Sequence, residues 1–134
     1  MSLGSNLGDR EQILHRAIAL IGERIGTVQR VSSFLETEPW GFRSEHPFLN
    51  AACLVLTTLS PEQCLEETQK IERELGRKRK SRNGIYHDRP IDIDLLMYDD
   101  LTLSTPKLTL PHPHMLERDF VMIPLREIMS EEKA

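Results

Sequence analysis

The sequence has no long hydrophobic run and no signal-peptide pattern. Its longest uninterrupted apolar stretch covers residues 51–56, far short of the roughly 20 residues that cross a bilayer. Charged side chains at Asp9, Arg10 and Glu11 interrupt the N-terminus before a signal-peptide core could form. We therefore expect a cytoplasmic protein with no membrane partner.

Cysteine and net positive charge are also scarce. Cys53 and Cys64 lie in apolar surroundings at no metal-ligand spacing, which predicts two reduced thiols in a core. The net charge of −4 argues against a general nucleic-acid binder. Cations are concentrated in residues 77–82, where five of the six side chains are positive. Such a run is usually solvated or binds polyanions without specificity.

The 134 residues suit a single domain, residues 1–134, that buries one core. Hydrophobic spacing and capping signals predict three helices: one capped by Asp9, one from the Ser60 cap to Gly76, and one over residues 121–128. β-Prone runs predict strands over residues 28–36, 51–58 and 91–98, the last turning at 99–100 into a hairpin with residues 101–103. This order predicts an α+β fold with an antiparallel or mixed sheet and helices packed on it.

The sharpest local feature is the alternation of residue types in residues 89–94, Arg-Pro-Ile-Asp-Ile-Asp. Side chains of a strand alternate between its faces, so Asp92 and Asp94 share a face about 7 Å apart and the isoleucines point to the core. Neighbouring carboxylates repel each other unless a cation lies between them. Oxygen ligands of this kind suit Mg²⁺, which takes its other ligands from water and substrate phosphates. On its own, such a pair is more often the exposed polar face of an edge strand.

The neighbouring residues favour a metal–polyphosphate site. Arg89 stands just before the carboxylates, and the basic run of residues 77–82 lies shortly upstream. Metal ions and guanidinium groups together neutralise the oxygens of a polyphosphate. The sequence has neither a G-x-x-x-x-G-K-[ST] loop nor a G-x-G-x-x-G fingerprint, so a different kind of site would hold any nucleotide.

A second candidate cluster lies in residues 111–120. His112 stands between two prolines, and Arg118 and Phe120 follow close to a predicted helix. A single histidine is more often an ordinary loop residue than a catalyst. This cluster does not indicate a reaction by itself.

Five segments taken together resemble the hydroxymethyldihydropterin pyrophosphokinases, in the order in which that family has them. The segments are residues 3–9, 48–52, 76–79, 89–94 and 111–120. Each is weak alone, but five in order are specific and extend over almost the whole chain. The resemblance implies a ferredoxin-like α/β/α sandwich with a mainly antiparallel sheet. It also implies transfer of pyrophosphate from ATP to 6-hydroxymethyl-7,8-dihydropterin, with release of AMP, in folate biosynthesis.

The resemblance further implies roles for particular residues. Asp92 and Asp94 would bind two Mg²⁺ ions. The residues that would contact the phosphates or support catalysis are Arg77, Arg89, His112 and Arg118, with Arg79 and Lys80 on the same basic run. The residues that would lie near the nucleotide are Gln69, Glu72 and Lys107, and Tyr86 would replace a tryptophan that other members carry in that loop. The residues that would hold the pterin are Phe48 and Phe120, on either side of its ring, with Asn50, Thr37 and Trp40 at its edge.

These implications predict two small-molecule partners, ATP and a reduced pterin. They predict no nucleic-acid partner, and they predict that the protein is a monomer. Two alternatives from other classes remain. One is a ferredoxin-like RNA-binding module that uses the basic run, although the aromatic content of 5% and the absence of an RNP-like strand count against it. The other is a Mg²⁺ phosphohydrolase that uses Asp92 and Asp94. The product separates them, because only a pyrophosphokinase forms AMP in a pterin-dependent reaction.

Overall fold

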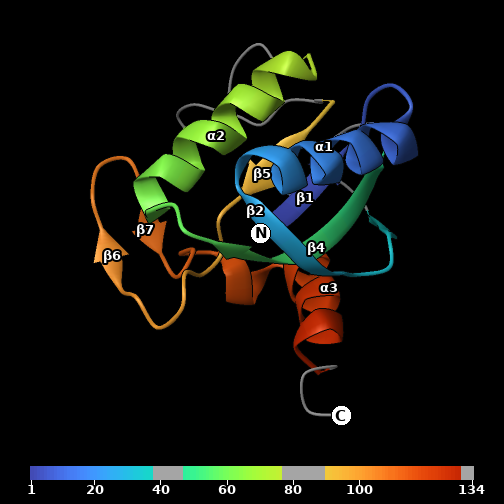
Figure 1. Ribbon diagram of the computed structural model, residues 1–134. Helices are drawn as coiled ribbons and strands as arrows, with labels where there is room; N and C mark the ends of the chain where they lie inside the picture. Colours follow the sequence, from blue (N-terminus) through green and yellow to red (C-terminus); the bar gives the residue numbers. More distant parts are fainter. Residues whose placement is uncertain (38–46, 77–89, 131–134) are drawn as a thin grey trace.

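The structure, a computed structural model, describes residues 1–37, 47–76 and 90–130. In chain order these residues form β1 (Ser2–Ser5), α1 (Arg10–Arg24), β2 (Gly26–Val31), β3 (Leu35–Thr37), β4 (Phe48–Thr57), α2 (Pro61–Glu74), β5 (Asp92–Asp94), β6 (Leu103–Ser104), β7 (Thr109–Leu110), the 3-10 helix η1 (Met115–Glu117) and α3 (Asp119–Ser130) (Figure 1). The three predicted helices are confirmed. α3 extends beyond the predicted residues 121–128 at both ends.

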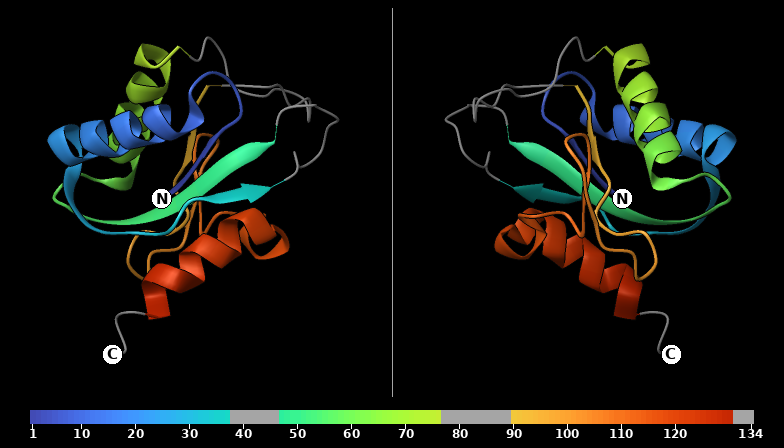
Figure 2. Two further views of the ribbon diagram at one scale, coloured as in Figure 1. Left: turned by 90° about the vertical axis from the view of Figure 1, so that its right-hand side faces the viewer. Right: turned by 90° about the vertical axis from the view of Figure 1, so that its left-hand side faces the viewer.

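β4 is the longest strand in the described part of the chain and organises the main sheet. β1 pairs with one side of β4 and β5 follows beyond β1, while β2 and β3 pair in turn with the other side of β4. All of these pairs are antiparallel. Figure 2 shows α1 and α2 on one face of this sheet and α3 on the other. The arrangement confirms the expected α+β fold, a ferredoxin-like α/β/α sandwich.

Local signals in the sequence account for the ends of the first two helices. The Asp9 carboxylate accepts a hydrogen bond from the Gln12 N–H at 3.2 Å and caps α1. Ser60 and Gln63 exchange side chain–backbone hydrogen bonds of 3.2 and 2.9 Å at the start of α2, which is a capping box. Gly76 follows this helix with φ of 103°, a left-handed conformation that glycine adopts without strain.

Two hydrophobic clusters pack against the sheet. The larger cluster joins buried residues of β1 and β5, such as Leu3 and Ile93, to α1 and α2. The smaller cluster joins Ala52 and Leu96 to the buried side of α3. Burial of these side chains supplies the main favourable free energy of folding. None of the helices in the described ranges is both long enough and apolar enough to span a bilayer.

The sequence patterns do not predict β1, although it lies in the middle of the sheet. All four of its residues are buried. A strand that is covered on both faces lacks the alternation of polar and apolar side chains that marks a half-exposed strand. Its strand conformation depends on its neighbours β4 and β5, which come much later in the chain.

The single strand predicted over residues 28–36 is wrong, because the chain forms β2 and β3 with a break between them. At the break, Ser32 Oγ accepts a hydrogen bond of 2.8 Å from the Ala52 N–H. The Ser33 N–H donates at 2.6 Å to the carboxylate of Glu127 on α3. Serine and glutamate side chains therefore replace part of the backbone ladder there.

The strand predicted over residues 91–98 is present but shorter, as β5, and the hairpin predicted with residues 101–103 is wrong. β5 ends at Asp94, and the carbonyl of Leu96 accepts a hydrogen bond of 2.8 Å from the His112 N–H. A turn is present at the predicted place, where the Leu101 N–H donates to the Tyr98 carbonyl at 3.0 Å. The strand after this turn, β6, pairs with β7 instead.

Candidate active site

One row of residues crosses the centre of the sheet on the face toward α3. Gly4 of β1 is paired with Asn50 of β4 on one side and with Asp92 of β5 on the other. Residues directly opposite each other in neighbouring strands share a face. A Cβ atom on Gly4 would lie 3.0 Å from Asn50 Oδ1 and 3.3 Å from a ring carbon of Phe48. The lack of a side chain at Gly4 therefore lets the Asn50 amide and the Phe48 ring lie close over the backbone of β1.

The two aspartates of β5 lie on this same face. Asp92 and Asp94 are half-buried, while Ile93 between them is 1% exposed and belongs to the larger hydrophobic cluster. The alternation predicted for these residues is confirmed. In the described ranges no group of three or more histidine, cysteine, aspartate or glutamate side chains could hold a metal ion. Two carboxylates are nevertheless a suitable protein donor set for Mg²⁺, which retains water and substrate-phosphate ligands.

Glu72 of α2 is a buried carboxylate that contacts the backbone of β5. Its side chain is 2% exposed, and Oε2 accepts a hydrogen bond of 2.8 Å from the Ile93 N–H. Within the described residues β5 pairs with β1 alone, so this N–H lies at the outer edge of the sheet. Glu72 thus takes the place of a neighbouring strand at that position. It fixes the segment that carries both aspartates.

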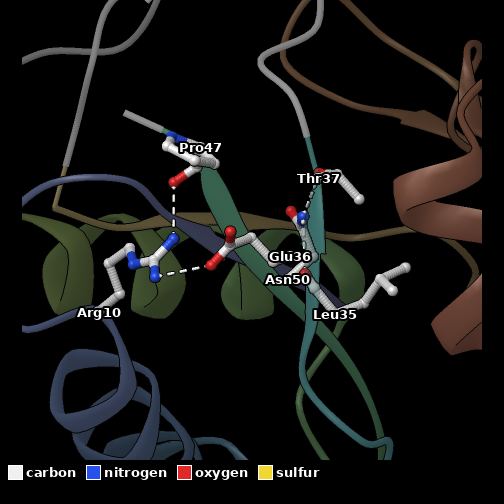
Figure 3. Close-up of polar contacts among 6 residues, drawn as sticks. All are labelled: Arg10, Leu35, Glu36, Thr37, Pro47 and Asn50. Carbon is white, nitrogen blue, oxygen red and sulfur yellow. Dashed lines mark hydrogen bonds and ion pairs between the residues drawn. The ribbon is translucent and has the colours of Figure 1, made fainter. Parts of the chain in front are cut away.

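The amide of Asn50 is held in a defined orientation. Asn50 is 2% exposed, and Nδ2 donates to Thr37 Oγ1 at 2.6 Å and to the Leu35 carbonyl at 3.3 Å (Figure 3). Both amide hydrogens therefore have acceptors inside the protein. Oδ1 lies over Gly4, 3.0 Å from where a Cβ atom would be. At this position the side chain presents a hydrogen-bond acceptor.

Two phenylalanines and one arginine lie around the same face. Phe48 begins β4, two residues before Asn50, and is buried. Phe120 is half-buried in the first turn of α3 and packs against the smaller hydrophobic cluster. The guanidinium carbon of the buried Arg118 lies 5.6 Å from the centre of the Phe120 ring, within the range of a cation–π interaction.

The remaining predicted site residues are less closely gathered. His112 is half-buried, and its backbone N–H donates a hydrogen bond to the Leu96 carbonyl. Its Nδ1 accepts a hydrogen bond of 3.3 Å from the His114 N–H. Gln69 is half-buried on α2, three residues before Glu72. Lys107 is exposed in the connection between β6 and β7. The residues that lie outside the described ranges are Trp40, Arg77, Arg79, Lys80, Tyr86 and Arg89.

The two cysteines belong to the core and not to this face. Cys53 and Cys64 are buried free thiols in the larger hydrophobic cluster, which confirms the prediction. Burial raises the pKa of both thiols, and a hydrogen bond with Thr57 opposes that effect at Cys64. Thiols of this kind are poor nucleophiles and poor metal ligands at neutral pH.

Gly4 is the residue of this row that the sequence patterns missed. It lies in the segment of residues 3–9 that carries part of the family resemblance. Because the sequence patterns do not predict β1, they could not place Gly4 beside Asn50 and Asp92 in the sheet. The only signal was a glycine in a short stretch of small residues, which is too common to indicate a site.

Comparison with known proteins gives a consistent result along the chain. The profile of the family described as 7,8-dihydro-6-hydroxymethylpterin-pyrophosphokinase (HPPK) matches residues 1–130. The 2-amino-4-hydroxy-6-hydroxymethyldihydropteridine pyrophosphokinase of Porphyromonas gingivalis is 52% identical over 129 residues, which cover 96% of this chain and 88% of that protein. The proteins of the same name from Bacillus subtilis and Aquifex aeolicus are 45% and 38% identical, covering 98% and 96% of this chain and 77% and 78% of their own lengths. The chain therefore belongs to the HPPK family.

Proposed function

We propose that this protein transfers pyrophosphate from ATP to the hydroxymethyl group of 6-hydroxymethyl-7,8-dihydropterin, giving the pterin diphosphate and AMP, in folate biosynthesis. Membership of the HPPK family supports the reaction. The observation that carries the proposal is the row Asn50–Gly4–Asp92. It joins an acceptor for one edge of a flat ring, a glycine over which that acceptor and the Phe48 ring lie closely, and a carboxylate for the metal–phosphate end.

The phosphate end of the site is assigned to β5 and the start of α3. Asp92 and Asp94 would hold two Mg²⁺ ions, and the metal would supply positive charge to neutralise the triphosphate. Arg118 and His112 contact phosphate oxygens, and the buried position of Arg118 limits the conformational entropy that its side chain loses on binding. Glu72 keeps β5 in place through the Ile93 N–H. The remaining residues assigned to the nucleotide and its phosphates are Gln69, Arg77, Arg79, Lys80, Tyr86, Arg89 and Lys107.

The pterin end is assigned to β3, β4 and the first turn of α3. Asn50 Oδ1 accepts a hydrogen bond from the pterin edge, because its Nδ2 hydrogens are already bound to Thr37 and Leu35. Phe48 and Phe120 contact the two faces of the ring. Thr37 and Trp40 complete the edge of the pocket.

The reaction needs positioning more than it needs a strong base. The pterin hydroxyl oxygen forms a bond to the β-phosphorus of ATP, and the bond between that phosphorus and the α,β-bridging oxygen breaks. AMP leaves with the bridging oxygen, and the hydroxyl proton passes to solvent. Asn50 and the two aromatic rings orient the hydroxyl, while the cationic side chains stabilise the charge that develops on phosphate oxygens.

One assay tests the activity directly. The protein is incubated with ATP, Mg²⁺ and the reduced pterin, and AMP, ADP and phosphate are separated. We expect AMP to form in step with the pterin diphosphate, and to disappear when Mg²⁺ is chelated. A dihydropterin with methyl in place of hydroxymethyl is the matched control and should give no AMP. ADP or phosphate formed without pterin would support a phosphohydrolase instead.

A further inference from the structure

Arg10, the first residue of α1, joins two segments that are distant from it in the sequence. Its Nη1 donates to the Pro47 carbonyl at 2.9 Å, and its Nη2 donates to Glu36 Oε2 at 2.9 Å (Figure 3). Glu36 lies in β3 and Pro47 directly precedes β4. One guanidinium group therefore connects the end of one strand to the start of its neighbour.

Helix stability does not explain a cation at this position. The N-terminus of a helix carries the positive end of the helix dipole, which favours negative side chains there. Arg10 instead directs its charge to Glu36 of the sheet. A planar guanidinium can donate two hydrogen bonds to acceptors on different segments at once, in a geometry that a lysine ammonium does not reproduce.

Glu36 lies in the same ladder as the residues of the proposed pterin pocket, and Pro47 directly precedes one of them, Phe48. In the β3–β4 ladder, Thr37 is opposite Phe48 and Leu35 is opposite Asn50. Glu36 falls between these pairs and is opposite Leu49, which packs against the larger hydrophobic cluster on the helical face. Arg10 thus holds the ladder from the helical side. On the other side, the hydrogen bond between Asn50 and Thr37 orients the amide whose Oδ1 lies over Gly4.

We propose that Arg10 is a positioning residue for the pterin subsite. By connecting the end of β3 to the start of β4, it keeps Thr37, Phe48 and Asn50 in their binding arrangement before the substrate arrives. This inference rests on the proposed function. Arg10 itself touches neither substrate, so its effect reaches the pterin through β3 and β4 and leaves the ATP end unaffected.

The chain contains a matched control pair. Arg24, in the last turn of the same helix, forms a salt bridge of 2.7 Å with Glu74 of α2. The side chains of this pair are 32% and 50% exposed, against 30% and 56% for Arg10 and Glu36. Partly exposed pairs of this kind contribute little to stability. The two arginines therefore differ mainly in which segments they connect.

Steady-state kinetics on Arg10→Ala and Arg24→Ala test the inference. We expect Arg10→Ala to raise the KM for the pterin about three- to tenfold with the KM for ATP unchanged, and Arg24→Ala to change neither. Glu36→Gln should have a smaller effect than Arg10→Ala, because the bond to Pro47 remains. Arg10→Lys should restore only part of the pterin affinity. An unchanged pterin KM in Arg10→Ala, or an equal rise in both KM values, would overturn the proposal.

Hydrogen exchange without substrate separates this inference from the assigned activity. Peptides containing residues 35–37 and 47–50 should exchange faster in Arg10→Ala than in the wild type, by about threefold or more, and at the wild-type rate in Arg24→Ala. Unchanged exchange at both segments would overturn the positioning role even in an active enzyme. If the wild type forms no AMP but exchange does respond, the connection by Arg10 stands and its assignment to a pterin subsite is wrong.

Discussion

The face of the sheet toward α1 and α2 and the face toward α3 take their side chains from alternate residues of the same strands. In β5, Ile93 enters the larger hydrophobic cluster while Asp92 and Asp94 lie on the opposite face. In β4, Ala51 is a core residue, and Asn50 before it places its amide oxygen over Gly4 on the opposite face. Stability and chemistry therefore depend on neighbouring residues, and single substitutions can separate the two.

The face toward α3 is itself divided. Ala52 and Leu96 lie under α3 in the smaller hydrophobic cluster. The next row of paired residues on this face consists of Asn50, Gly4 and Asp92. None of the three belongs to the smaller hydrophobic cluster. The buried Asn50 amide is accommodated there because both of its Nδ2 hydrogens have acceptors inside the protein. Ala52 of β4 therefore belongs to the core under α3, and Asn50, two residues before it, does not.

The largest expected effect lies on the face toward α3. Asp92→Ala and Asp94→Ala should each lower turnover by at least about 10²-fold, the scale for losing one preorganised electrostatic group. Both aspartates are half-buried and lie on the face opposite the core residue Ile93, so the fold should be retained and the midpoint of thermal unfolding should change little. Pterin-dependent AMP formation at saturating Mg²⁺ measures the first effect, and calorimetry the second. Near-wild-type turnover in either variant would remove that aspartate from the proposed metal site.

The next effect concerns affinity at the pterin end. Phe120→Ala should weaken pterin binding about tenfold, because the substrate loses one aromatic contact and buried area, while an ATP analogue binds almost as before. Phe120→Leu is the control that keeps most of the apolar volume and should lie between the wild type and the alanine variant. Titration calorimetry with each ligand separates the subsites. If nucleotide affinity collapses and pterin affinity does not, the pocket is wrongly assigned.

How well the sequence predicts each feature depends on how local its causes are. The caps at Asp9 and Ser60 involve residues three positions apart, and both are confirmed. The shared face of Asp92 and Asp94 follows from the period of a strand and needs no knowledge of its neighbours. The turn after Tyr98 is likewise encoded locally and is present.

The errors arise where distant segments decide the structure. β1 depends on two strands that follow it in the chain, and the carbonyl of Leu96 pairs with His112 instead of the segment after the turn. The orientation of the Asn50 amide depends on the register between β3 and β4. The bond from Glu72 to the backbone of β5 depends on how α2 packs. No pattern within one segment contains this information.

A smaller effect is expected on the helical face, at the residue between the two aspartates. Ile93→Val should lower the free energy of unfolding by about 0.5–1.5 kcal/mol, the usual cost of removing one buried methylene from a core. Its turnover below the unfolding transition should stay close to that of the wild type, because the shortened side chain leaves the carboxylates in place. Urea denaturation measures the stability. A turnover loss as large as that of the aspartate variants would show that the two faces are not separable.

The smallest effect tests whether water is excluded from the hydrophobic cluster between the sheet and helices α1 and α2. Burial raises the pKa of Cys53 and Cys64 in the folded protein, so the unfolded chain releases these thiol protons first as the pH rises. Their contribution to stability is therefore fully present below the unfolded thiol pKa of about 8.5 and is lost as the pH rises above it.

The free energy of unfolding, measured by urea denaturation at several pH values, should decline less steeply above this pH in a Cys53→Ala, Cys64→Ala double variant than in the wild type. Other groups titrate in the same range, but they are common to both proteins, so the difference in slope isolates the thiols. Equal slopes would mean that the thiols ionise as readily in the folded protein as in the unfolded chain, and that water reaches the core between the sheet and α1 and α2.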